Sequence, residues 1–211
     1  MSVPSELVKK LREMSGAPMM DCKKALEEVH GDLEQAFTVL RKRGIASAAK
    51  KAGRMASEGI VGAYIHAGGK IGVLVEVNCE TDFVARHEEF QALVHDLAMQ
   101  VCATDPRFIR KDDVTLEVLE REKEVLRAQA ASTGKPPEVL DRIVEGKLGK
   151  FYEDTCLYEQ HFIKDTTGTM TIRELIASKI AKFGENITVR RFARFKVGEG
   201  LAKASPDGAS G

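Results

Sequence analysis

The sequence predicts an α+β fold, and three observations support this prediction. Residues 5–43 carry apolar side chains at helical spacing, whereas from Gly59 onward the apolar residues alternate with a period of two. Two alternating runs flank a GGK turn, and a third run lies near the C-terminus. We therefore expect a three-helix module, then a three-stranded antiparallel sheet with helices on one face and a projecting helical hairpin.

Residues 1–44 are predicted to form a small module of three short helices. GAP at 16–18 breaks the first helix, and GD at 31–32 ends the second helix and caps the third. Gly44 is expected to be the C-cap of the third helix. A helical unit of under about fifty residues is only marginally stable alone, so we expect a small module attached to a larger core.

Residues 45–58 are predicted to be a basic linker that contains a short helix. The stretch RKRGIASAAKKAGR at 41–54 has six basic residues and no acidic one. It is either a solvated linker or a patch for RNA or an acidic partner. Because no aromatic residue is interleaved with the basic ones, RNA binding is not favoured.

Residues 59–200 are predicted to form the α+β core. GIVGAYIHA and IGVLVEVN indicate a β-hairpin around the GGK turn at 68–70. FQALVHDLAMQV at 90–101 has one apolar helical face, and NITVRRFARFKV at 186–197 is the third predicted strand. Strict alternation along that strand places four apolar residues on one side, namely Ile187, Val189, Ala193 and Phe195.

Within the core, residues 115–151 are predicted to form a helical hairpin. Each helix carries a narrow apolar stripe, and its other faces are charged, which is typical of an antiparallel arm that projects from the body. STGKPP at 132–137 is the predicted turn of this arm. LAKASPDGASG at 201–211 is predicted to be a disordered tail.

The composition indicates a cytoplasmic protein. The 32 basic and 32 acidic residues balance, so no overall charge favours nucleic acid. The four cysteines stand far apart without a CxxC pair, which argues for reduced thiols rather than a zinc site or a disulfide framework. The chain starts without the apolar run of a signal peptide, and no window approaches the roughly 18 apolar residues that span a bilayer.

No combination of residues indicates catalysis. HEEFQ at 87–91 begins like the zinc motif HExxH, but Gln91 stands in the place of the second histidine. GGKIG at 68–72 lacks a Ser or Thr after the lysine and precedes a strand rather than a helix, so it is no phosphate loop. The five histidines are scattered. We therefore expect no enzyme, catalytic residue, metal or cofactor, and a protein that acts by binding.

The stretch NCETDFVAR at 78–86 places an acid and a large aromatic side by side where a predicted strand ends. The pair Asp82 and Phe83 suits a surface that contacts something both apolar and charged. The alternative is local: Asp82 caps the following helix and Phe83 folds back onto the sheet.

Four stretches resemble a known family. LREMSGAPMMDCKKALEE at 11–28 and EVNCETDFVA at 76–85 are similar to elongation factor Ts, the guanine-nucleotide exchange factor of the bacterial GTPase elongation factor Tu. The likeness continues through GKPPEVLDRIVEGKLGKF at 134–151, which resembles the family's helical-hairpin arm, and through FKVGEG at 195–200. The four stretches occur in the family's order and indicate a bacterial-type, short form with a single core unit.

The resemblance implies a function for the first module. In the family this module is ubiquitin-associated-like and docks on the nucleotide-binding domain of the GTPase. The residues that match its contact surface are Leu11, Arg12, Met19 and Met20. Methionine is flexible and suits a binding face. In the alternative interpretation, Leu11 and one methionine pack inside the small bundle.

The resemblance also assigns a role to the TDFV loop, which consists of Thr81, Asp82, Phe83 and Val84. By similarity, Phe83 inserts between helices of the GTPase near its Mg²⁺ site, and Asp82 acts on the same region. This insertion promotes GDP release and GTP rebinding during translation elongation, without bond chemistry. The implied partner is elongation factor Tu, both GDP-bound and nucleotide-free.

Two departures and one rival function complete the expectations. Ser15 and Pro18 stand where many relatives have Thr and Gly, which affects only a turn. Longer members carry a duplicated core, so we expect this chain to pair as a homodimer. The rival function is a ribosome- or RNA-associated protein that uses the basic stretch 41–54 together with a second basic cluster, formed by Arg190, Arg191, Arg194 and Lys196.

Overall fold

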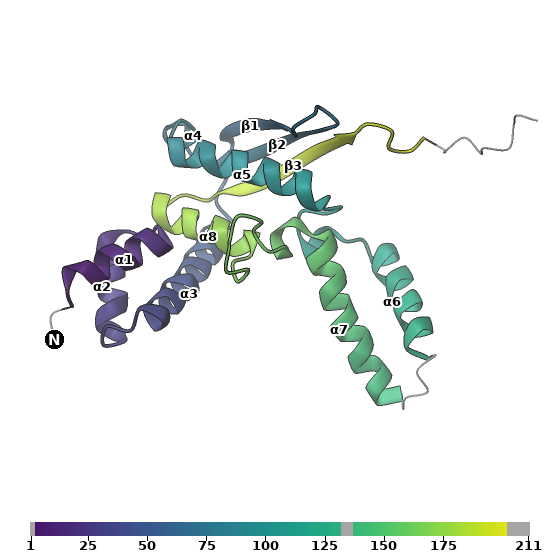
Figure 1. The fold of residues 1–211 in the computed structure, drawn as a ribbon, viewed down its shortest axis with the longest axis horizontal. Helices are drawn as coiled ribbons and strands as arrows, with labels where there is room; N and C mark the ends of the chain where they lie inside the picture. Colours follow the sequence, from purple (N-terminus) through teal and green to yellow (C-terminus); the bar gives the residue numbers. More distant parts are fainter. Residues whose placement is uncertain (1–2, 132–136, 202–211) are drawn as a thin grey trace, which may run out of the picture.

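The computed structural model describes residues 3–131 and 137–201, which form an α+β structure (Figure 1). The α-helices are α1 (Ser5–Ser15), α2 (Met19–Glu28), α3 (Leu33–Lys51), α4 (Asp82–Ala85), α5 (Glu88–Thr104), α6 (Leu116–Ala131), α7 (Pro137–Thr155) and α8 (Ile172–Phe183). The strands are β1 (Glu58–Ile65), β2 (Ile71–Cys79) and β3 (Thr188–Lys196), and the short 3₁₀ helices are η1 (Lys111–Asp113) and η2 (Leu157–Glu159).

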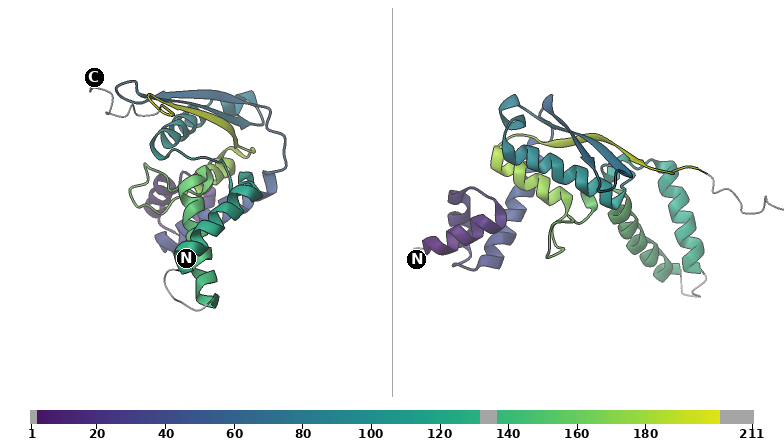
Figure 2. Two further views of the ribbon diagram at one scale, coloured as in Figure 1. Left: turned by 90° about the vertical axis from the view of Figure 1, so that its right-hand side faces the viewer. Right: turned by 45° about the horizontal axis from the view of Figure 1, so that its top comes forward.

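The three strands form an antiparallel sheet in the order β1-β2-β3, as the alternating patterns predict. Side chains of the central strand alternate between the two faces, and Val73, Val75 and Val77 are buried on the inner face. α5 covers this inner face, and α8 lies on the far side of α5 (Figures 1 and 2). The prediction of an α+β sheet with helices on one face is confirmed.

The outer face of the sheet carries exposed apolar side chains on all three strands. We call this set the outer apolar face; it consists of Val61, Ala63, Ile65, Leu74, Ala193 and Phe195. The strand register supports this grouping, because Leu74 lies opposite Ala63 on one side and Ala193 on the other. Among the helices of the described residues, none packs on this face in Figure 2.

A β-bulge changes which residues of β3 face inward. The pairing of β2 with β3 shifts between Glu76 and Val77, and Arg190 is the extra residue. Strict alternation places Val189 and Phe195 on the same side, and this prediction is wrong. Val189, which precedes the bulge, is buried, whereas Ala193 and Phe195, which follow it, are exposed on the outer face.

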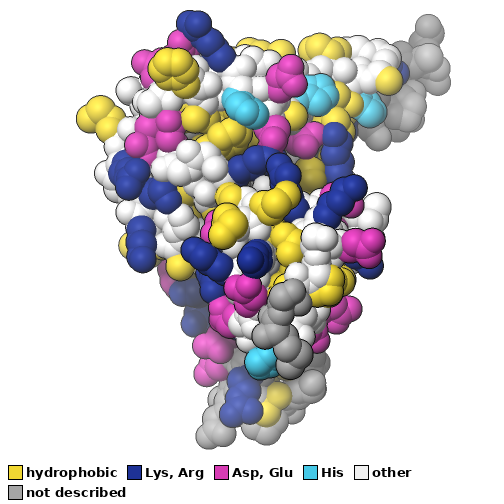
Figure 3. All heavy atoms as spheres, turned by 90° about the vertical axis from the view of Figure 1, so that its left-hand side faces the viewer, with side chains coloured by type: hydrophobic (Ala, Val, Ile, Leu, Met, Phe, Trp, Pro, Cys, Tyr) yellow, Lys and Arg dark blue, Asp and Glu magenta, His cyan; other side chains and the backbone are white. Residues whose placement is uncertain are grey.

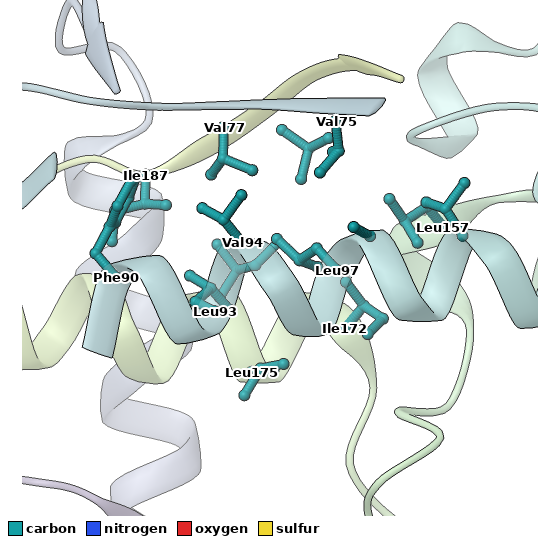
Figure 4. Close-up of a cluster of buried hydrophobic side chains, with 14 of the residues drawn as sticks. Val75, Val77, Phe90, Leu93, Val94, Leu97, Leu157, Ile172, Leu175 and Ile187 are labelled. Atoms are coloured by element: carbon teal, nitrogen blue, oxygen red, sulfur yellow. The ribbon is translucent and has the colours of Figure 1, made fainter. Parts of the chain in front are cut away.

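The main hydrophobic core lies between the sheet, α5 and α8 (Figure 4). Phe90, Leu93 and Leu97 of α5 are buried, and α5 contacts the strands on one side and α8 residues such as Ile172 on the other. A helix buried on two sides needs apolar residues around most of its circumference, which explains why α5 has more buried residues than any other helix of the described chain.

The N-terminal helices enclose a separate small core, which includes the fully buried Leu11 and Leu26. α3 does not end at Gly44 as predicted but continues to Lys51 and packs along α8. Gly44 lies at this contact, where an added Cβ would be 3.6 Å from the carbonyl oxygen of Ala177. The helix therefore crosses the predicted boundary between module and linker, and the domain division stays a prediction, as does the module's ubiquitin-associated-like character.

α6 and α7 form the projecting arm, at the opposite end of the molecule from the N-terminal helices (Figures 1 and 2). Its own small core contains Leu126, Ala130 and Val144. The predicted turn at 132–137 and the predicted tail at 201–211 lie outside the described residues, apart from Pro137 and Leu201. In the part of the chain that is described, no helix has the length and apolar character to cross a membrane.

Candidate partner-binding site

The TDFV segment forms the N-cap and first three residues of a single helical turn, α4, that follows the central strand of the sheet. Thr81 is its N-cap, because its hydroxyl oxygen accepts a hydrogen bond from the amide of Val84 at 3.5 Å. Glu80 is the only residue between the end of β2 and this cap. The turn therefore lies directly at the end of the central strand, and the TDFV segment is a structured turn and not a free loop.

Phe83 is the most exposed large apolar side chain in the described residues, with 89% of its surface accessible. The alternative in which it folds back onto the sheet is therefore wrong. Burying a phenylalanine is worth about 1.5–3 kcal/mol, so this exposed ring can contribute strongly to binding a partner.

Asp82 is exposed at the first position of α4, where it forms an ion pair with Arg86 at 2.6 Å. The cap of α4 is Thr81, so the alternative in which Asp82 caps the helix is also wrong. Both partners of the ion pair are more than half exposed, and such pairs contribute only about 0–1 kcal/mol. A partner can therefore replace Arg86 at Asp82 at little cost.

Val84 faces inward, together with Ala85, and both belong to the main core. The prediction that Val84 contacts the partner is corrected, because its side chain is 9% exposed and anchors the turn instead. The thiol of Cys79 lies beneath the turn and donates to the carbonyl oxygen of Thr81 at 3.2 Å. Burial raises the pKa of this thiol to about 11, so it stays protonated and unreactive.

The N-terminal helices present a second exposed apolar group. Met19 and Met20, at the start of α2, are 51% and 61% exposed, and Arg12 is also exposed. Leu11, by contrast, is 0% exposed and fills the core of the three helices, so its predicted role as a contact residue is corrected. Met14 is also half exposed. The sequence pattern did not indicate this exposure, because the spacing of Met14 from Leu11 is that of a core position.

α4 and the N-terminal helices lie at the same end of the molecule, on the left in Figure 1. Figure 3 shows this end directly, and its hydrophobic side chains are interspersed with lysines and arginines and also with acidic side chains. The end that carries the exposed phenylalanine and the exposed methionines therefore also carries charges of both signs.

Comparison with known proteins shows the family of the chain. A family model described as elongation factor TS matches residues 6–172. The chain belongs to the elongation factor Ts family. It is 61% identical to elongation factor Ts of Koribacter versatilis over 99% of this chain and 96% of that protein. It is 57% identical to elongation factor Ts of Carboxydothermus hydrogenoformans over 97% of this chain and 94% of that protein.

Membership in the elongation factor Ts family makes the chain a translation factor that acts by nucleotide exchange and not a catalyst of bond chemistry.

The residues that resembled a zinc motif have structural roles. His87 caps α5 by accepting a hydrogen bond from the amide of Glu89. The Lys182 ammonium, which bonds the Glu89 carboxylate, lowers the pKa of that carboxyl. Among the described residues no three metal-binding side chains converge.

The basic cluster on β3 does not gather into one patch. Arg190 and Arg191 both bind Glu76, at 2.9 and 2.7 Å, and the hydrogen bond from Arg190 lowers the pKa of that carboxyl. Arg194 lies on the inner side, where it forms an ion pair with Asp105. The bulge at Arg190 thus separates residues that the rival RNA-binding interpretation had grouped together.

Proposed function

We propose that this chain is the guanine-nucleotide exchange factor of elongation factor Tu and that it acts by inserting Phe83 near the Mg²⁺ and phosphate site of that GTPase. The observation that carries the proposal is the exposed ring of Phe83 on a turn whose other apolar residues are buried in the core. An apolar side chain that exposed contributes little to the packing of the described residues. Asp82 beside it supplies a negative charge to the same region.

The physical basis is the dependence of nucleotide binding on Mg²⁺. Mg²⁺ requires near-ideal octahedral geometry and is the main counter-charge of the nucleotide phosphates. A wedge that disturbs this geometry weakens GDP binding, and every ~1.4 kcal/mol lost lowers the affinity tenfold. Because the factor and the nucleotide weaken each other's binding to the GTPase, GTP then displaces the factor. The factor thus acts on both the GDP-bound and the nucleotide-free GTPase.

The N-terminal helices supply docking in this proposal. Met19, Met20 and Arg12 form the contact surface on the nucleotide-binding domain of the GTPase, and the flexible thioether chains adapt to it. Two contact regions on one molecule raise the effective concentration of the second once the first has bound. Translation takes place in the cytoplasm, and we infer this location for the chain.

The decisive experiment is stopped-flow release of a fluorescent GDP analogue from elongation factor Tu. We expect the wild type to accelerate release strongly, Phe83→Ala to lose about tenfold or more of that acceleration, and excess Mg²⁺ to slow it. Leu116→Ala is the matched control, because Leu116 is also exposed but lies on the arm. Equal rates for Phe83→Ala and wild type would refute the wedge. RNA binding without any effect on the GTPase would support the rival function.

We further propose that two copies pair through the outer apolar face. An exposed apolar surface that crosses three strands is typical of an interface, and a two-fold axis would bring the same residues together from both copies. The ion-paired group of Glu76, Arg190 and Arg191 borders this face as a polar rim. Light scattering should give the mass of two chains for the wild type and of one chain for Phe195→Glu. A wild-type mass of one chain at working concentration would exclude the dimer.

A further inference from the structure

The α4 turn is held by a carboxylate from a distant part of the chain. Glu185, in the loop between α8 and β3, accepts hydrogen bonds from the amides of Glu80 and Thr81 at 3.1 and 3.0 Å. Its other oxygen accepts a hydrogen bond from the Thr81 hydroxyl at 2.6 Å. We call these three hydrogen bonds the Glu185 clamp. They bridge positions more than a hundred residues apart in the sequence.

A second carboxylate makes the reverse connection. Glu80 accepts a hydrogen bond from the amide of Asn186 at 2.6 Å and lies 3.5 Å from the Arg54 guanidinium. The side chain of Asn186 donates to the carbonyl oxygen of Arg54 at 2.8 Å. The turn and the α8–β3 loop are therefore joined in both directions, and the segment between α3 and β1 is tied to the same loop.

The position of Glu185 follows from the way α8 ends. Gly184 adopts a left-handed conformation with φ 76°, which ends the helix and directs the next residue toward the turn. Lys182 pairs with Glu89 of α5 at 2.5 Å, and the Phe183 ring packs edge-on against His87 at 5.1 Å. The C-terminal end of α8, from which Glu185 follows, is thus fixed against α5, the helix that directly follows α4.

The turn depends on this support. α4 has four residues, and a single helical turn is not stable by itself because its nucleation is unfavourable. The capping bond from Val84 to Thr81 is 3.5 Å long and therefore weak. Hydrogen bonds to an ionised carboxylate are about twice as strong as neutral ones, so the clamp contributes more to the orientation of the turn than the cap does.

We propose that Glu185 is a positioning residue for nucleotide exchange, which fixes the direction in which Phe83 leaves the sheet edge. This inference rests on the function proposed above, in which Phe83 is the wedge. In this inference Glu185 does not touch the GTPase, and Glu185 acts through Thr81 and the backbone of the turn. A wedge must arrive in a defined geometry, and a displacement of about 1 Å can cost on the order of a hundredfold in rate.

The test compares Glu185→Ala with Glu185→Gln in the GDP-release assay. We expect Glu185→Ala to lower the maximal release rate roughly tenfold, because the amides of Glu80 and Thr81 lose their acceptor. The factor concentration that gives half of the maximal rate should change less than twofold, because the docking helices are untouched. Glu185→Gln keeps the volume and one acceptor oxygen and should fall between wild type and Glu185→Ala. Glu117→Gln, on an exposed carboxylate of α6, is the control.

Two further readouts separate positioning from a general loss of structure. Hydrogen exchange of the Glu80 and Thr81 amides should become faster in Glu185→Ala, while amides of α5 keep their protection. When Phe83→Ala is already present, adding Glu185→Ala should lower the maximal rate less than twofold, because no wedge remains to be positioned. The Glu185→Gln variant keeps the test valid if Glu185→Ala does not fold.

The outcomes distinguish this inference from the proposed function. A normal maximal rate for both Glu185 variants, while Phe83→Ala is slow, would overturn the clamp and leave the wedge intact. Equal losses from Glu185→Ala with and without Phe83 would also overturn it, since Glu185 would then act elsewhere. A normal rate for Phe83→Ala would refute the wedge itself and the clamp with it.

Discussion

The α4 turn and the N-terminal helices are both proposed to contact the GTPase, but they are attached to the molecule differently. The turn continues a central strand, buries Val84 in the main core and is held by Glu185. The N-terminal helices enclose a core of their own and join the rest mainly where α3 packs along α8. In the proposed mechanism, the rigidly attached region is the one that must act with defined geometry, and the separately folded region is the one that docks.

The largest expected effect is on the core beneath the turn. Phe90 is fully buried in the first turn of α5, between the sheet and α8 (Figure 4). Phe90→Ala should lower the free energy of unfolding by about 3–5 kcal/mol, because it leaves a cavity that the core cannot close. Urea unfolding measures this loss, and the maximal rate of GDP release should fall with it. A change below about 1 kcal/mol would show that the core does not support the turn as described.

A corresponding change in the small core tests whether the two regions are separate. Leu26→Ala should destabilise the N-terminal helices by about 2–4 kcal/mol, since Leu26 is fully buried there. We expect a higher factor concentration for half-maximal GDP release and an unchanged maximal rate. Hydrogen exchange should show faster opening of α2 and unchanged protection of α5. A lower maximal rate would mean that the docking helices also position the wedge.

The difference between local signals in the sequence and contacts between distant residues explains how far the sequence predicted the site. The pattern located the TDFV segment and the three strands correctly, because periodicity and the end of a strand are local signals. It could not decide whether Phe83 folds back, since that depends on Val84 and Ala85 filling the space beneath the turn. Glu185 is over a hundred residues from Thr81, and no local pattern connects them.

Tertiary contacts explain the other errors. Gly44 has the character of a C-cap, but the packing of α3 on α8 extends the helix beyond it. The bulge at Arg190 adds one residue to β3 and reverses the faces of all the residues that follow. Leu11 matched a contact position in the family but lies at a core position of its own helix.

The smallest expected effect lies at the junction between the two regions, in the loop that precedes α8. The Asp165 carboxylate accepts hydrogen bonds from the amides of Thr167, Thr169 and Met170, the last at 2.7 Å. The hydrogen bond from the Met170 amide is the main cause that lowers the pKa of Asp165 from 3.8 to about 2. Arg41 of α3 binds the same loop, through the carbonyl oxygen of Thr169.

A carboxyl whose pKa is lower in the folded than in the unfolded state stabilises the fold above its unfolded pKa, and this stabilisation disappears as the pH falls through the folded pKa. Because the group is partly open to solvent, we expect Asp165→Asn to cost only about 1 kcal/mol at pH 7. The difference in unfolding free energy between wild type and variant should shrink between about pH 4 and pH 2. A difference that stays constant over this range would show that the carboxylate charge does not hold the loop.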